Sequence, residues 1–281
     1  MSKLLRPAVT AGLLAVLAAR IDWGPFAASF RGVRPGWLAA GLWLYLLLQA
    51  LSGWRWWLLA GAFGFPRPLR RLTAVYFLGM YCNLLLPTSV GGDVVRAWYL
   101  DAGQGRRMAA LLCVLVDRLL GLLVLLALAC AAAALAVRDL PAWVAAGVWC
   151  LSAGVFAGLL AAPWLSRVTG RLLERRSGPG FRPGRAARLL YLLRRTATVP
   201  AGVVGGLLGL RRQPGVLAWA LAGSLVIQAG NVAVVWAAAR ALNADVPVLA
   251  LAVAVPVVSF LTLLPVSVNG MGVREAGMGV I

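Results

Sequence analysis

The fold of this chain is decided by two stretches that share one pattern: residues 85–96 read LLPTSVGGDVVR, and residues 263–274 read LLPVSVNGMGVR. The two stretches align without a gap, and eight of the twelve positions are identical. Leucine and valine matches carry little weight in so apolar a chain, but proline, serine, glycine and arginine all fall in register. We therefore interpret the pair as an internal repeat, against the alternative of a coincidence between two apolar helix ends.

The composition around these stretches is that of a membrane protein. Of the 281 residues, 62% are hydrophobic and 12% are charged, whereas soluble domains carry about 25% charged residues. A spanning helix needs about 20 apolar residues. The segments without Asp, Glu, Lys or Arg are 7–19, 35–54, 72–92, 119–137, 140–166, 196–210, 213–239 and 246–273. The first is either a signal peptide or a retained helix, and we favour the helix; residues 196–210, with four glycines and Pro200, are expected to lie on the surface.

The arginine distribution predicts how the chain is oriented. The chain has 27 Lys and Arg against 8 Asp and Glu. Short cytoplasmic loops are enriched in basic residues, so the clusters at 67–71, 106–107, 167–195 and 211–212 are expected in the cytoplasm. We expect a basic cytoplasmic loop over 165–200. Its nine arginines between 167 and 195, like the pair at 106–107, are expected to lie on anionic lipid headgroups rather than on nucleic acid.

The segment 72–92 has basic flanks at both ends, so it is predicted to enter and leave on the cytoplasmic side as a re-entrant hairpin. Pro87 and the glycines after it supply the break. Three crossings follow, at about 109–137, 142–164 and 214–239, and this odd number makes the next apolar stretch begin outside. The two copies are then related by a pseudo-two-fold axis in the membrane plane, as in many secondary transporters.

We therefore expect an all-α, polytopic integral membrane protein with two re-entrant broken-helix hairpins in inverted-repeat topology. Residues 1–281 are expected to form a single transmembrane domain. The first repeat covers about 37–137 and the second about 214–281.

Several classes of chemistry are excluded by residues that the chain lacks. It contains no histidine, which excludes Ser-His-Asp and Cys-His catalysis and histidine-ligated metals. Lys3 is the only lysine, so no Gly-Lys-Ser/Thr phosphate loop exists and ATP-driven pumping by this chain alone is excluded. The cysteines each lie in an apolar run and are expected to be buried hydrophobes: Cys82, Cys113, Cys130 and Cys150. We expect no catalytic residue, no metal and no cofactor.

Charged side chains within apolar segments are functional candidates, because a charge at the bilayer centre costs about 2.5 to 3.5 kcal/mol. Asp93 and Arg96 are three residues apart, which places them on one helix face within pairing distance. A structural ion pair that closes the hairpin is the alternative to a binding role for them. Asp117 and Arg118 project about 100° apart on a helix. We expect them to have different partners, with Asp117 pairing to Arg96 or Arg274.

Arginine suits a phosphodiester headgroup, because its planar fork binds phosphate at two points and stays charged. Arg96 and Arg274 occupy equivalent positions, so we expect them to bind a headgroup phosphate in turn. Arg55, which stands among three tryptophans, is instead expected to anchor the chain at the membrane interface. The predicted substrate-binding residues are Ser89, Gly92, Asp93, Arg96, Asp117, Arg118, Ser267, Asn269, Gly270, Arg274 and Glu275, with Pro87 and Pro265 as breaks that face a cavity.

The motifs resemble the flippase-like membrane domain of the lysylphosphatidylglycerol synthase transmembrane-region family. The residues that carry the resemblance are Asn83 to Pro87, Gly91, Gly92, Asp93, Arg96, Asp117, Arg118, Gly121, Pro265, Ser267, Asn269, Gly270 and Gly272 to Glu275. The similarity extends from about residue 10 to the end. It implies a multi-pass protein of the inner cell membrane that moves anionic or modified phospholipids, or lipid-linked sugars, between leaflets. Family members usually continue through further helices, so we expect C-terminal helices that are missing after Ile281.

Three other functions remain open. In the family resembled, aminoacyl transfer resides in a soluble domain after the membrane part; the longest aqueous segment here, about 36 residues, is too short for such a domain, so we do not expect an enzyme. The chain could instead be the membrane half of an aminoacyl-phospholipid synthase, or a scaffold or accessory subunit for a separate lipid-modifying enzyme. A small-solute transporter would use the same repeats. We favour a lipid translocase in which the headgroup passes through polar clefts while its tails stay in the bilayer.

Overall fold

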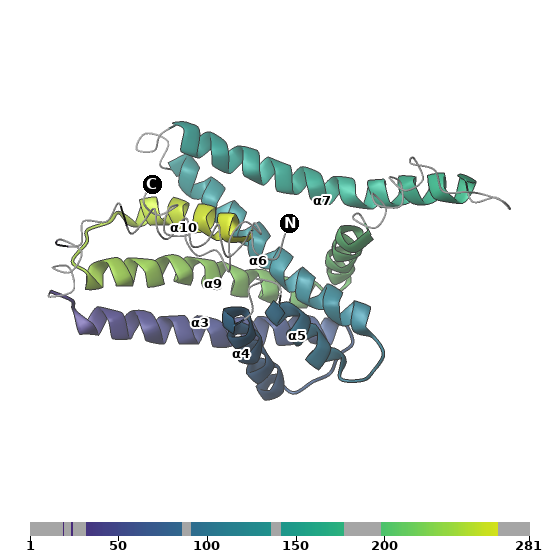
Figure 1. Cartoon of the computed structure of the whole chain (residues 1–281), viewed down its shortest axis with the longest axis horizontal. Helices are drawn as coiled ribbons and strands as arrows, with labels where there is room; N and C mark the ends of the chain where they lie inside the picture. Colours follow the sequence, from purple (N-terminus) through teal and green to yellow (C-terminus); the bar gives the residue numbers. More distant parts are fainter. Residues whose placement is uncertain are drawn as a thin grey trace.

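The computed structural model describes residues 32–85, 91–135, 142–176 and 198–263, together with Ala19 and Gly24. The elements in these ranges are helices: α3 (Pro35–Ala62), α4 (Leu69–Leu85), α5 (Gly91–Asp101), α6 (Arg107–Leu135), α7 (Ala142–Arg176), a helix over 198–209, the 3-10 turn η1 (Leu210–Arg212), α9 (Pro214–Ala241) and α10 (Val248–Leu263) (Figure 1). No strand occurs among the described residues, in agreement with the all-α prediction. Residues 7–18 and residues 264–274 of the second motif lie outside them.

Among the described residues, four helices are long and apolar enough to cross a membrane: Pro35–Ala62, Arg107–Leu135, Ala145–Thr169 and Pro214–Ala241. The three predicted crossings overlap the last three of these, with ends that differ by at most five residues. Large apolar side chains point outward from them, among them Trp43, Leu160 and Trp219, as lipid-facing positions require. The chain is therefore a polytopic membrane protein.

Three details differ from the predictions. Residues 165–176 continue α7, so the basic segment expected to be a loop from 165 begins as helix. All four cysteines are free, but only Cys113 is buried and Cys150 is exposed on α7. Residues 198–209 do not simply cover the surface, because Val203 is buried and Gly206 packs on Phe63 and Val116.

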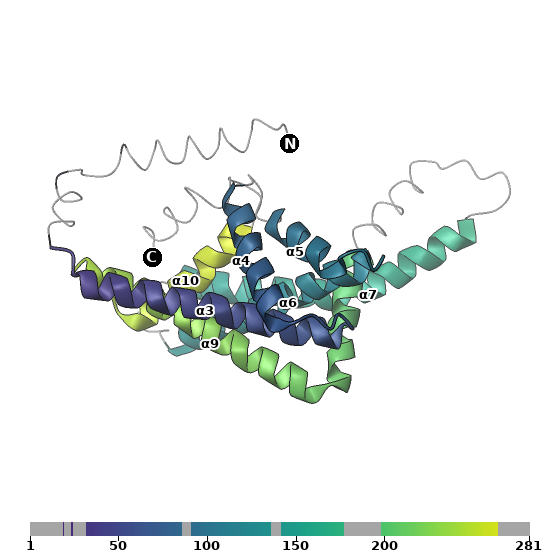
Figure 2. The ribbon, with the colours of Figure 1, turned by 90° about the horizontal axis from the view of Figure 1, so that it is seen from below.

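α3 and α9 lie side by side and run antiparallel (Figure 2). At one end the Arg34 N–H donates to the Ala241 carbonyl at 2.9 Å, and halfway along both helices Leu48 packs on Gly230. Each helix has 28 residues and begins with a proline, which loses no helical hydrogen bond at that position. Antiparallel order is what an inverted repeat requires. The repeat itself stays a prediction.

α4 and α5 form an antiparallel hairpin with very close backbone contact. A Cβ on Gly92 would clash with the carbonyl oxygen of Gly79 and the side chain of Asn83, so only glycine permits this approach. The Gly92 N–H donates to Asn83 Oδ1 at 2.7 Å. Gly92 therefore packs against α4, and its role in substrate binding stays a prediction. Re-entrant insertion of this hairpin into a bilayer stays a prediction.

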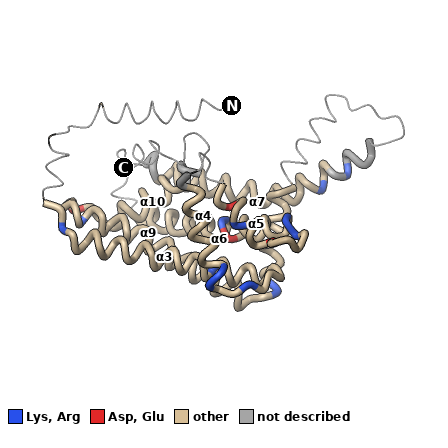
Figure 3. Tube along the Cα trace, turned by 60° about the horizontal axis from the view of Figure 1, so that its bottom comes forward, with Lys and Arg blue, Asp and Glu red and all other residues tan. Residues whose placement is uncertain are grey.

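Arginines of three turns gather at one end of the bundle, where α3 ends and α9 begins (Figure 3). Arg106 has a structural role there, since its guanidinium donates to the carbonyls of Gly64 at 2.9 Å and Phe63 at 3.0 Å. It also lies 4.6 Å over the Phe65 ring. Arg106 thus stabilises the end of α3, and the Arg107 side chain is 82% exposed. Contact of this pair with lipid headgroups stays a prediction.

The largest hydrophobic core lies at this arginine-rich end, between α3, α4, α5 and α6. Trp56, Leu59, Leu100 and Leu120 are almost completely buried in it. Smaller apolar clusters join α6 to α7 and α10, and α9 to α10. α6 runs through the middle of the bundle (Figure 2). Asp117, near the middle of this helix, is consequently buried.

Candidate functional site

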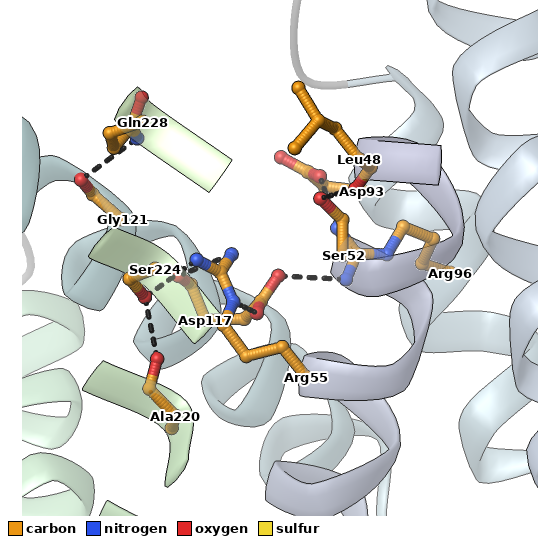
Figure 4. A network of polar contacts seen from close by, with 10 residues as sticks. All are labelled: Leu48, Ser52, Arg55, Asp93, Arg96, Asp117, Gly121, Ala220, Ser224 and Gln228. Carbon is orange, nitrogen blue, oxygen red and sulfur yellow. Dashed lines mark hydrogen bonds and ion pairs between the residues drawn. The ribbon is translucent and has the colours of Figure 1, made fainter. Parts of the chain in front are cut away.

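Five charged side chains form a chain of ion pairs across the interior. Asp117 binds two arginines, with Oδ1 2.9 Å from Arg55 Nε and Oδ2 2.9 Å from Arg96 Nη2 (Figure 4). Asp93 Oδ1 lies 3.7 Å from Arg96 Nη1, and Asp93 Oδ2 pairs with Arg118 Nε. Three guanidiniums and two carboxylates leave this network with an excess of one positive charge.

The network is deeply buried and joins four helices. The exposed fraction of the side chain is 7% for Arg55 and Arg96 and 2–3% for the two aspartates, but 35% for Arg118. Arg55 Nη1 donates to Ser224 Oγ of α9 at 2.7 Å. A buried charge without a partner is strongly destabilising, so the ion pairs hold α3, α5 and α6 in one arrangement, and the hydrogen bond to Ser224 adds α9.

Arg96 is enclosed on both faces of its guanidinium. Its Cζ lies 4.4 Å from the ring centroid of Trp56 and 4.5 Å from that of Tyr76, within the range of cation–π attraction. The predicted pairing of Asp117 with Arg96 is confirmed, as is the prediction that Asp93 lies within pairing distance of Arg96. These contacts favour the structural alternative for Arg96 over direct binding of a headgroup.

The prediction that Arg55 is an interfacial anchor is wrong. Its side chain points inward to Asp117 and Ser224, as the contacts above show. Among the neighbouring tryptophans, Trp56 is fully buried, and Trp54 packs edge-on against Trp219 with ring centroids 6.3 Å apart. The neighbouring tryptophans suggested an interfacial position for Arg55. The more informative pattern is that Ser52 and Arg55 lie three residues apart, on one helix face, and the structure buries both of them.

A cavity of about 560 Å³ opens beside the network, between α3, α6, α9 and the helix over 198–209. Its polar side chains are Gln49, Ser52, Arg55, Tyr76, Arg118, Gln228, Asn231 and Ser259, and none of the described residues that line it is acidic. Gln228 Nε2 donates to the Gly121 carbonyl at 3.1 Å, and Asn231 Nδ2 donates to Gln228 Oε1 at 3.3 Å. An arginine-bearing cavity without carboxylates in its described lining suits an anionic group.

The structure brings together part of the predicted site. Asp93, Arg96, Asp117 and Arg118 meet in the ion-pair network, with Asp117 and Arg118 taking different partners as predicted. Of these four, Arg118 lines the cavity. The following predicted residues lie outside the described residues: Pro87, Ser89, Pro265, Ser267, Asn269, Gly270, Arg274 and Glu275.

Besides Arg55, the cavity has uncharged polar residues that were not predicted from the sequence, among them Gln49, Ser52, Gln228 and Asn231. These residues are uncharged, so they are not among the charged side chains that were taken as functional candidates. The signal that could have found them is an amide side chain in the middle of an otherwise apolar spanning helix, where an unpaired polar group is costly.

A family model for the lysylphosphatidylglycerol synthase TM region matches residues 3–281. The match covers both Pro-to-Arg motifs and every described helix from α3 to α10, and it confirms the resemblance drawn from the motifs. Searches of curated proteins and of solved structures found no match to this chain.

Proposed function

The chain belongs to the lysylphosphatidylglycerol synthase TM region family, and we propose that it moves an anionic or modified phospholipid, or a lipid-linked headgroup, between the leaflets of the inner cell membrane. Family membership and the four apolar helices make it a membrane protein linked to lipid biology. One observation supports translocation in particular. Arg55 and Arg118 line a cavity that has no acidic side chain in its described lining. This cavity lies beside a buried network with an excess of one positive charge.

A phosphodiester crosses the apolar interior only where protein charges replace its hydration. In the proposed mechanism Arg118 supplies that charge, because it is the most exposed arginine of the network and lines the cavity. Asp93 and Asp117 hold Arg118 and Arg55 in place, so the cationic wall is preorganised. The headgroup enters the cavity while the lipid tails remain in the bilayer. No catalytic residue, metal or cofactor takes part, so we class the chain as a transporter and not as an enzyme.

The α4–α5 hairpin is re-entrant in this proposal, and the segment after α10 is its inverted counterpart, which opens toward the other leaflet. Three observations support this arrangement. α3 and α9 are antiparallel, the two helices of the hairpin return to one end, and the arginines of three turns gather at that end.

The proposal is tested in liposomes that contain the full chain and a fluorescent anionic phospholipid, with a membrane-impermeant reductant reporting on transfer between leaflets. Arg118→Gln should slow transfer by about tenfold or more, and Arg118→Lys should recover part of the rate because lysine keeps the charge but lacks the two-point fork. Arg240→Gln is the matched control, because Arg240 pairs with the exposed Asp245 at 2.8 Å, away from the cavity. An unchanged rate for a correctly folded Arg118→Gln protein would contradict the proposal.

A further inference from the structure

The antiparallel helices α3 and α9 carry matching amides at one level. Counted from the first proline of each 28-residue helix, the fifteenth residue is glutamine in both, Gln49 and Gln228. The eighteenth residue is Ser52 in α3 and Asn231 in α9. In an antiparallel pair of equal helices the midpoints coincide, and the contact of Leu48 with Gly230 places this level halfway along both. A local two-fold axis that relates α3 to α9 therefore passes close to the two glutamines.

The four polar residues at this level, Gln49, Ser52, Gln228 and Asn231, all line the cavity. Arg55, six residues after Gln49, lies about 9 Å further along α3 toward the arginine-rich end, at 1.5 Å per residue. The cavity consequently has a cationic part near that end and an uncharged amide part at the middle of the spanning helices. Within the described structure the Gln49 side chain makes no hydrogen bond, while Gln228 is held in place through Gly121 and Asn231.

We propose that these amides are the uncharged half of the headgroup site, and that the preferred substrate is a phospholipid whose headgroup carries one net negative charge and hydroxyl groups beyond its phosphate. Amide side chains both donate and accept hydrogen bonds, as hydroxyl groups do. The excess of one positive charge in the network balances one phosphodiester. An aminoacylated headgroup would instead bring a cation into a cavity whose described lining has two arginines and no acid, which costs affinity.

This inference rests on the proposed lipid-translocating function and is tested by binding. The full chain in detergent is titrated with short-chain phosphatidylglycerol and with short-chain phosphatidylmethanol, which carry the same charge but differ in headgroup hydroxyls. The wild-type protein should bind phosphatidylglycerol about tenfold more tightly, the value expected for one or two net hydrogen bonds. Gln49→Leu and Gln228→Leu should remove this preference, whereas the exposed control Gln104→Leu should keep it.

Three results would overturn the inference: equal affinity of the wild-type protein for the two lipids, a preference that survives in both glutamine variants, or equal or tighter binding of short-chain lysyl-phosphatidylglycerol. Gln228→Leu loses the hydrogen bond to Gly121 and is the variant at risk of misfolding. Gln49→Leu, which breaks no hydrogen bond of the described structure, then decides the test.

Transfer in liposomes separates this inference from the proposed function. Transfer of phosphatidylglycerol and phosphatidylmethanol at equal rates, with equal affinities, would leave the function standing and overturn the substrate class. Selective binding without transfer of either lipid would overturn the function and leave the binding site standing.

Discussion

Replacing Asp117 by asparagine tests whether the buried ion-pair network holds the bundle together. Asparagine has the same shape, but it removes a carboxylate that lies 2.9 Å from both Arg55 and Arg96. One of its two polar atoms becomes an NH2 donor that faces a guanidinium, which is itself a donor. The excess charge of the network then rises from one to two.

The expected loss follows from burial and geometry. Removing one partner of a buried ion pair costs about 3–5 kcal/mol, chiefly because the remaining charge stays desolvated without compensation. The Asp117 side chain is 2% exposed, so water does not replace its oxygens. Arg55 keeps Ser224 and Arg96 keeps Asp93 as polar neighbours. We therefore expect the free energy of unfolding to fall by about 3–5 kcal/mol and not by the sum of two broken pairs.

The assay is reversible unfolding by SDS in mixed micelles, followed by circular dichroism. Asp245→Asn is the control, because Asp245 is 93% exposed and its ion pair with Arg240 should contribute nothing measurable. Adding Arg55→Gln to Asp117→Asn should recover part of the loss, since one of the two excess charges is removed. A loss below about 1 kcal/mol in Asp117→Asn would refute the interpretation that these charges are desolvated and mutually dependent.

Three further outcomes are expected. Gly92→Ala should lower the free energy of unfolding by about 1–3 kcal/mol, because its Cβ meets the backbone of α4; wild-type stability in this variant would show that α4 and α5 separate easily. Arg106→Ala should cost about 1 kcal/mol through its lost bonds to the end of α3, and Arg107→Ala should cost nothing measurable in the same assay. In a cysteine-free background, an impermeant thiol reagent should label Gln104→Cys from the cytoplasmic face and Ala244→Cys from the outer face; labelling of both from one face would contradict the predicted orientation.

The amino-acid sequence by itself determined the fold class and the spanning helices. Hydropathy over about 20 residues and the positions of arginine clusters are properties of single segments, so they predict α6, α7 and α9 without knowledge of their neighbours. Helical spacing also predicted that Asp93 and Arg96 lie within pairing distance of each other, and their charged groups are 3.7 Å apart. The two Pro-to-Arg motifs, together with Asp117, Arg118 and Gly121, were sufficient to indicate the family, which the match over residues 3–281 confirms.

The tertiary structure decided which polar residues face a cavity and which are enclosed. Arg55 was expected at the membrane interface, but it binds Asp117, 62 residues away on α6. Arg96 was expected to bind a headgroup, but it is stacked between Trp56 and Tyr76. The role of a buried charge depends on the partners that other helices supply, and in a bundle these come from distant segments whose approach is set by packing. For the same reason the amides of α3 and α9 line one cavity only because the antiparallel pairing places their midpoints at one level.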